Sequence, residues 1–212
     1  MTGNEALLTF ALIAGGFLLG GVMFSRALPK LLTGKDVCAL RADKNPGAAN
    51  VFVHCGVPMG LLCLVLDMAK GGVPVALALR TLDPARFGFA AVMTAPVLGH
   101  ALGLLNGGHG GKCIAVIFGV LIALLGITPL GFVLAGIYIF LAGIVRVRPN
   151  GRCSIFTFSL FALCALGMGI FSGRHAVTLG ALILSAVSIV KHVKSAAALR
   201  AAEDVQPKTQ DA

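Results

Sequence analysis

Long apolar segments that alternate with short polar ones limit the fold of this chain more than any other feature. Hydrophobic residues make up 58% of its 212 residues and charged residues only 12%, which excludes a disordered chain and disfavours a soluble globular domain. A hydrocarbon core of roughly 30 Å takes about 20 apolar residues as a helix. We therefore expect an all-α, polytopic integral membrane protein with about seven transmembrane helices. These helices are expected at residues 6–28, 51–68, 87–105, 112–126, 130–145, 155–171 and 175–190.

Basic residues between the apolar segments predict how the chain is oriented. Cytoplasmic loops of membrane proteins carry an excess of Lys and Arg, and the loop 29–50 and the segment 146–152 are both basic. This pattern predicts that the N-terminus lies outside and the C-terminus in the cytoplasm. Segment 70–86 carries basic residues on the expected outer side, so five or six spans remain open. Residues 71–80 either extend a helix or form a re-entrant piece.

The sequence shows neither an internal repeat nor a second domain. We assign residues 1–198 to a single membrane-embedded domain and residues 199–212 to a polar cytoplasmic tail. The formal net charge of +9 points to anionic lipid near the cytoplasmic loops and to an anionic substrate. Nucleic acid is not expected as a partner because no basic run is interleaved with aromatic residues. The six cysteines lack metal-ligand spacing, and we expect neither a metal nor an organic cofactor.

A glycine-rich stretch, GHALGLLNGGHGGK at residues 99–112, separates two of the apolar segments. Glycine-rich backbone can turn its N–H groups inward around an anion, and a helix that begins at Lys112 adds its N-terminal dipole. We therefore interpret Gly110, Gly111 and Lys112 as a phosphate or carboxylate cradle. A flexible connector between two membrane helices is the alternative. A P-loop is excluded because Cys113, and not a hydroxyl residue, follows the lysine.

Four ionisable residues are candidates for chemistry near the membrane face. His100 ends an apolar segment, where it is either a packed residue bonded to Asp36 or to a backbone carbonyl, or a general base or phosphate donor. His109 lies in the turn and is expected to be exposed. Asp67 and Lys70 are spaced for an i,i+3 ion pair, and ionisable groups in a membrane are often functional. Structural pairing is the simpler explanation for these two residues.

A second polar loop faces the same side in this topology. Asn45-Pro46-Gly47 is typical of a tight turn, and Asn50 precedes an apolar run as a helix N-cap would. Turn and cap chemistry accounts for both asparagines. The functional alternative is that their amide groups donate hydrogen bonds to a phosphoryl or hydroxyl oxygen.

With both loops laid out, the chain resembles the acyl-phosphate:glycerol-3-phosphate acyltransferase family, of the PlsY type, over nearly its whole length. The motifs of that family's first loop, its D-x-x-K-G segment and its glycine-rich loop occur here in the same order and with nearly the same spacing. The first-loop motif, the glycine-rich motif and the remnant of a third motif near the C-terminus fall on one predicted membrane face. The matching residues are Gly20, Lys30, Gly34, Asp36, Asn45–Asn50, Asp67–Gly71, Gly99, His100, Gly110–Lys112, Ala115, His192 and Leu199.

The resemblance implies a transfer of a fatty acyl group from acyl phosphate to the 1-position of glycerol 3-phosphate. The product would be lysophosphatidate, at the entry to phospholipid biosynthesis. His100, Asn45 and Asp36 would be the catalytic residues: His100 would orient or donate to a substrate oxygen, and Asp36 would position a cation such as Arg41. The phosphate-binding and substrate-binding residues would be Lys112, Gly110, Gly111, His109, Gly47, Asn50 and Arg41.

The resemblance also implies a location and partners. The protein would be a multi-pass protein of a bacterial inner membrane with its active face in the cytoplasm. Acyl phosphate, glycerol 3-phosphate and the lipid bilayer would be its partners, and the enzyme that produces acyl phosphate is a further candidate. No cofactor or metal is implied.

Departures from the family pattern keep two alternatives open. Gly21 replaces a serine, Cys38 and Ala198 replace arginines, and His109 replaces a lysine. Several of the lost groups are cations or hydroxyls of the kind that hold phosphate. One alternative is therefore a catalytically inactive relative that acts as a scaffold. The other is a small transporter or channel-like protein, which is permitted by the seven expected spans, the glycine-rich packing and a re-entrant segment at 71–80.

Overall fold

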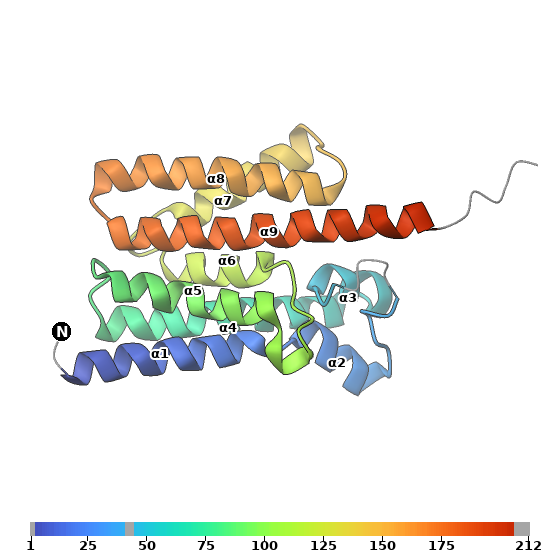
Figure 1. Cartoon of the computed structure of the whole chain (residues 1–212), viewed down its shortest axis with the longest axis horizontal. Helices are drawn as coiled ribbons and strands as arrows, with labels where there is room; N and C mark the ends of the chain where they lie inside the picture. The colour runs from blue at the N-terminus through green and yellow to red at the C-terminus, as the bar shows by residue number, and fades with distance from the viewer. Residues whose placement is uncertain (1–2, 41–44, 206–212) are drawn as a thin grey trace, which may run out of the picture.

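The computed structural model describes residues 3–40 and 45–205, and all of the regular structure in these residues is helical (Figure 1). The expected all-α fold is confirmed for this part of the chain. The helices are α1 (Gly3–Gly21), α2 (Phe24–Thr33), α3 (Ala48–Cys55), α4 (Val57–Thr81), α5 (Phe87–Leu102), the 3₁₀ turn η1 (Leu104–Asn106), α6 (Ile114–Ala123), α7 (Leu130–Ile139), the π-helical η2 (Phe140–Ile144), α8 (Asn150–Ser172) and α9 (His175–Val205).

Among residues 3–40 and 45–205, five helices are long and apolar enough to cross a membrane, namely α1, α4, α5, α8 and α9. The expected spans at 112–126 and 130–145 correspond to the shorter apolar helices Ile114–Ala123 and Leu130–Ile144. Each of the seven expected segments therefore contains helix, and the count of seven full crossings stays a prediction.

Two expected spans begin or end differently from the sequence interpretation. The span 6–28 is divided at Val22 and Met23, where α1 ends and α2 begins. The span 51–68 is divided at Gly56, whose φ of 83° falls in a region that glycine adopts without steric cost. Helix α4 then continues to Thr81, so residues 71–80 extend a helix and do not form a re-entrant piece.

Two expected helix ends are also wrong. Asn50 is not an N-cap, because α3 begins at Ala48 with Gly47 as its N-cap. The polar tail from residue 199 is helical as far as Val205, and the alanine-rich segment 196–202 explains this because alanine has the highest helix propensity. The rest of the expected tail lies outside the described residues.

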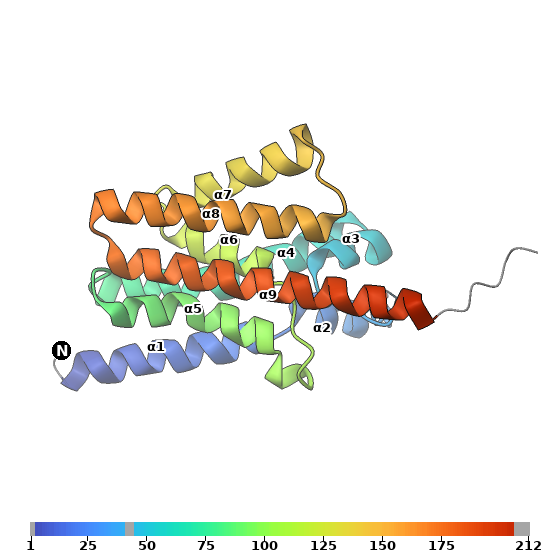
Figure 2. The same ribbon diagram turned by 45° about the horizontal axis from the view of Figure 1, so that its top comes forward.

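Successive long helices run in opposite directions, so the connections gather at two ends of the bundle (Figures 1 and 2). Segments 22–40, 45–56, 103–113 and 145–149 and the C-terminal part of α9 share one end, which we call the loop end. The N-terminus of α1 and the turns 82–86, 124–129 and 173–174 lie at the opposite end. This arrangement brings both predicted polar loops to the same end of the molecule.

Glycines allow the central helices to approach at backbone distance. A methyl group at Gly20 would overlap the carbonyl of Pro96, which brings α1 against α5, and a methyl group at Gly119 would overlap the carbonyl of Met68, which brings α6 against α4. Small residues at such crossings are the usual means by which helices pack in lipid. The main apolar core then forms around α5, α6, α8 and α9.

We expect Gly119→Ala to lower the stability of the bundle by about 1–3 kcal/mol, because the added methyl group can be accommodated only if α4 and α6 separate. Gly136→Ala in α7 is the matched control, since a methyl group there has no neighbour within 4 Å. Thermal unfolding of both variants in detergent measures the effect. Equal midpoints for the two variants would contradict the close packing of α4 and α6.

A smaller apolar cluster holds the first polar loop in place. Val37 and Cys38 in the loop pack with Ala48 and Val51 of α3 and with Cys63 of α4, and all five are buried. The loop that carries Asp36 is therefore anchored to the bundle by burial of its apolar residues.

Candidate active site

Arg26 of α2 joins the two predicted loops at the loop end. One terminal nitrogen of its guanidinium donates to Asn106 Oδ1 at 2.7 Å, and the other donates to Asp36 Oδ2 at 3.1 Å. The sequence interpretation paired Asp36 with Arg41, which lies outside the described residues. In the structure the cation beside Asp36 is Arg26, ten residues away in the chain.

Asp36 is held as a carboxylate by this arrangement. The hydrogen bond from Arg26 lowers the pKa of Asp36 below its ordinary value, and the backbone N–H of Cys38, 3.1 Å from Oδ1, contributes in the same direction. The charged form is therefore the one that stabilises the contact between the loops.

We expect Arg26→Gln to lower the stability of the protein at pH 7 by at most about 1 kcal/mol, since the ion pair is partly exposed. The folded-state pKa of Asp36 lies below its unfolded value, so this contribution is present above about pH 4 and is lost as the pH falls through the lowered pKa. Urea unfolding of both proteins at pH 7 and pH 3 tests this expectation. A difference of equal size at both pH values would show that the charge on Asp36 is not involved.

The Asn45–Asn50 turn orders the start of α3. The amide of Asn50, which is 6% exposed, donates to the carbonyl of Asn45 at 2.8 Å, and the N–H of Gly47 donates to the same carbonyl at 2.9 Å. A side chain at Gly47 would meet the Asn45 amide at 2.7 Å. These contacts support the turn role that the sequence suggested for Asn45 and Gly47, and they show that Asn50 bonds the turn from within α3 rather than as an N-cap.

The glycine-rich segment forms a compact loop folded back on the end of α5. Gly103, Gly107 and Gly108 have positive φ, which glycine adopts without strain. The N–H of Gly111 donates to the carbonyl of His100 at 3.0 Å, and a side chain at Gly110 would overlap the carbonyl of Ala101. The segment thus packs closely against the last turn of α5.

The two basic side chains of this loop differ in exposure. His109 is exposed, as expected, and Lys112 is half-buried beside α9. Ser188 of α9 donates to the carbonyl of Lys112 at 3.3 Å, and Lys191 of α9 donates to the carbonyl of Ala101 at 2.9 Å. Helix α9 therefore packs against both ends of the glycine-rich loop.

His100 is buried beneath the loop, with 4% of its surface exposed. The sequence had suggested Asp36 or a backbone carbonyl as the partner of this ring. In the structure its Nδ1 instead lies 2.9 Å from Nζ of Lys70. Lys70 forms the expected i,i+3 ion pair with Asp67 at 2.8 Å, and Ser25 donates to the other Asp67 oxygen at 2.5 Å.

Sequence reasoning missed Ser25, Arg26, Asn106 and Lys191. Ser25 and Arg26 stand in the first turn of an amphipathic helix that was read as the end of a membrane span. An arginine and a serine at the end of an apolar segment are a weak signal. They gain significance only when their distant partners are known.

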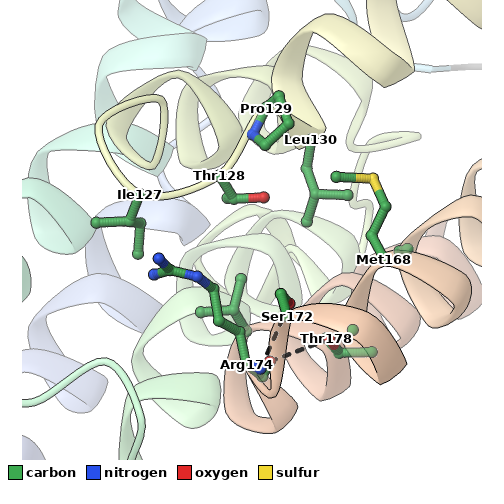
Figure 3. Close-up of a pocket in the computed structure, with 11 residues that line it drawn as sticks. Ile127, Thr128, Pro129, Leu130, Met168, Ser172, Arg174 and Thr178 are labelled. Atoms are coloured by element: carbon green, nitrogen blue, oxygen red, sulfur yellow. Dashed lines mark hydrogen bonds between the residues drawn. The ribbon is translucent and has the colours of Figure 1, made fainter.

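A cavity of about 110 Å³ lies at the opposite end of the bundle (Figure 3). Figure 3 shows the 127–130 turn across from Met168, Ser172 and Arg174. This cavity is separate from the loops that carry the candidate residues. Within the described part of the chain, no group of three or more His, Cys, Asp or Glu side chains is arranged to hold a metal ion.

Comparison with known proteins identifies the family. The family model described as glycerol-3-phosphate acyltransferase matches residues 10–202. A relative named glycerol-3-phosphate acyltransferase from Anaeromyxobacter dehalogenans (strain 2CP-1) is 34% identical over 192 residues, which cover 88% of this chain and 90% of the relative. Another relative of that name, from Myxococcus xanthus (strain DK1622), is 36% identical over 144 residues, or 68% of this chain and 73% of the relative.

The fold is also shared with a solved structure. The crystal structure of PlsY (YgiH), an integral membrane glycerol 3-phosphate acyltransferase in its glycerol 3-phosphate form, superposes with a TM-score of 0.77. It is 24% identical in sequence, and the match covers 92% of both chains. Like that protein, this one is a multi-pass membrane protein, and the chain belongs to the glycerol-3-phosphate acyltransferase family.

Proposed function

We propose that this protein is an enzyme that transfers a fatty acyl group from acyl phosphate to the 1-position of glycerol 3-phosphate. The observation that carries the proposal is the meeting of the glycine-rich loop and the Asp36 loop at one end of the bundle, where Arg26 joins them. The related structure, solved with glycerol 3-phosphate and in a lysophosphatidic acid form, supports the same acceptor and product. Family membership favours this activity over a transporter or channel.

The reaction needs positioning and charge stabilisation more than a nucleophile from the protein. The 1-hydroxyl oxygen of glycerol 3-phosphate attacks the acyl carbonyl carbon, the bond from that carbon to the phosphate oxygen breaks, and inorganic phosphate leaves. The leaving phosphate accepts the proton of the hydroxyl group, so the step balances without a covalent intermediate. Such a reaction is accelerated chiefly by orientation of the substrates and by donors directed at the developing charge.

Each part of the loop end has a role in this proposal. Lys112, His109 and the backbone N–H of Gly110 bind a substrate phosphate, because they combine cationic or donor groups with glycine backbone. Gly111 shapes this site, since its N–H donates to the carbonyl of His100. Asn45, Gly47 and Asn50 shape the facing loop. Asp36 positions a cation, for which the structure provides Arg26 in addition to the Arg41 inferred from the sequence.

The membrane orientation follows from charge. The loop end carries the basic segments 26–35 and 146–152, and an excess of Lys and Arg is typical of the cytoplasmic side. We therefore place the loop end in the cytoplasm of a bacterial cell, with the bundle in the inner membrane. Acyl phosphate then reaches the site with its chain among the apolar helices and its phosphate at the loop end.

The direct test is an assay of the protein purified in detergent with palmitoyl phosphate and glycerol 3-phosphate, in which phosphate release is followed. We expect release that depends on the acceptor, and lysophosphatidate as the product. Omission of glycerol 3-phosphate is the control for simple hydrolysis of the donor. A folded protein without acceptor-dependent release would refute the proposed activity and favour a scaffold role.

The orientation has its own test. Single cysteines introduced at Asp36 and His109 in a cysteine-free background should react from the cytoplasmic side with a reagent that does not cross membranes. Arg86→Cys, at the opposite end of the bundle, should react from the outside. Labelling of positions 36 and 109 from different sides would contradict a site shared by the two loops.

A further inference from the structure

Four buried polar side chains from three helices form a chain of contacts beneath the glycine-rich loop. Ser25 of α2 contacts Asp67 of α4, Asp67 contacts Lys70 one turn later, and Lys70 contacts His100 of α5. Between 0% and 4% of the surface of each residue is exposed. Burial of unpaired charges costs several kcal/mol each, so the charge states of these groups are tied to one another.

Asp67, the acidic residue in this series of contacts, is ionised. Ser25 donates its hydroxyl proton to Oδ2 of Asp67, and Oδ1 faces Nζ of Lys70 at 2.8 Å. Oδ2 therefore accepts a hydrogen bond, and Oδ1 lies at ion-pair distance from a cation, as expected of an ionised carboxyl group. Lys70 is the cation beside it, so charge balance in this buried cluster requires the ammonium form of Lys70.

An ammonium group has three N–H bonds and no acceptor. Nζ of Lys70 donates to the carbonyl of Val22 at 2.5 Å and lies 2.9 Å from Nδ1 of His100, and it forms an ion pair with Oδ1 of Asp67 at 2.8 Å. Because the ammonium group can only donate, one of its N–H bonds donates to Nδ1 of His100. That nitrogen must carry a lone pair, and the ring proton must reside on Nε2.

The groups around His100 oppose a second proton on its ring. Lys70 faces it from α4, and Lys191 from α9 donates to the carbonyl of the next residue, Ala101, so both nearby cations disfavour an imidazolium ion. Asp67 is already paired with Lys70. His100 is therefore neutral, with Nε2–H as its one donor.

The Nε2 edge of the ring faces the glycine-rich loop. A side chain at Gly111 would overlap Nε2 of His100, so the imidazole occupies the space directly beneath that backbone. The N–H of Gly111 in turn donates to the carbonyl of His100 at 3.0 Å. The ring donor and the loop backbone are thus held in one geometry.

We propose that Lys70 is a positioning residue for the acyl transfer. Together with Asp67 and Ser25, it holds His100 as the neutral tautomer protonated at Nε2, so that His100 is a fixed hydrogen-bond donor beneath Gly111 and not a general base. The catalytic consequence rests on the proposed function, whereas the tautomer of His100 does not.

The tautomer is measured directly by ¹⁵N NMR of the protein labelled at its histidines, without any substrate. Single substitutions of His54, His109, His175 and His192 assign their own signals, so the assignment of His100 does not depend on a variant at that position. We expect protonated Nε2 and unprotonated Nδ1 for His100 between pH 6 and pH 9. Protonated Nδ1, or two protonated nitrogens in this range, would overturn the proposal.

The catalytic consequence is tested with the double variant Lys70→Met/Asp67→Asn, which removes both charges together and leaves no unpaired ion. Misplacement of a catalytic group costs up to about 100-fold in rate, and we expect a loss of this order in kcat. We also expect a new fall in rate below about pH 6.5, the ordinary pKa of histidine, since Nδ1 of His100 is then free to take a proton.

The shape of the pH profile separates positioning from a structural role. A uniform loss at every pH, or no loss, would contradict the proposal. Thr157→Val is the matched control, because Thr157 is also fully buried but its hydroxyl has no hydrogen-bond partner among the described residues. If the wild-type protein itself shows no acyl transfer, the proposed function fails, and the NMR result still decides the tautomer.

Discussion

Lys112→Ala is expected to reduce acyl transfer at least about 100-fold while the protein remains folded, because removal of one preorganised charge-stabilising group typically costs 10²–10³ in rate. Lys112 is half-buried where the glycine-rich loop meets α6 and α9. Its carbonyl, and not its side chain, is bonded to Ser188, so truncation of the side chain leaves that contact with α9 intact. The measurement is phosphate release from palmitoyl phosphate that depends on glycerol 3-phosphate.

Lys194→Ala is the matched control for this prediction. Lys194 is an exposed lysine on α9, so its removal changes the net charge of the protein by the same amount as Lys112→Ala. We expect the control to retain wild-type activity. Full activity of Lys112→Ala would remove Lys112 from the phosphate site, and equal losses in both variants would indicate a general effect of surface charge.

Gly111→Ala is expected to abolish activity almost completely. A methyl group at position 111 would overlap Nε2 of His100, and packed interiors accommodate such an overlap only by shifts of backbone and side chains. Either the loop lifts away from α5 or the imidazole leaves its contact with Lys70, and both displace groups that we assign to the site. Phosphate release and the His100 NMR signals report the two effects separately.

Gly151→Ala provides the comparison for Gly111→Ala. Gly151 lies in the first turn of α8, at the same end of the bundle, and a methyl group there has no neighbour within 4 Å. The Gly151→Ala variant should keep wild-type activity and the wild-type NMR signals of His100. If Gly111→Ala were as active as this control, the close contact between the loop and His100 would not matter for turnover.

Hydropathy alone predicted most of the architecture. Each of the seven apolar segments contains helix, because the length and composition of such segments are local properties that the membrane selects directly. Because successive membrane helices run in opposite directions, the sequence also predicted that the Asp36 loop and the glycine-rich loop lie at the same end of the bundle. Helix breaks within apolar segments were harder to see, because Val22-Met23 and Gly56 differ little from their surroundings in hydropathy.

The candidate site was predicted in part. The motifs pointed correctly to the family, and the i,i+3 spacing of Asp67 and Lys70 correctly predicted an ion pair. They did not predict that Arg26 would pair with Asp36, or that His100 would be buried against Lys70. The roles of His100, Asn45, Lys112 and the other proposed site residues remain predictions for the experiments described here.

The sequence by itself determined that this protein is helical and membrane-embedded, and that its polar loops meet at one end. Hydropathy and loop charge are properties of consecutive residues, so they can be evaluated without knowing the tertiary structure. Only the tertiary structure decided which distant side chains become partners. Lys70 and His100 are 30 residues apart, and Arg26 and Asn106 are 80 apart. Such pairs depend on how the helices pack together, because a buried or half-buried charge must find its partner among the few groups that packing brings within reach.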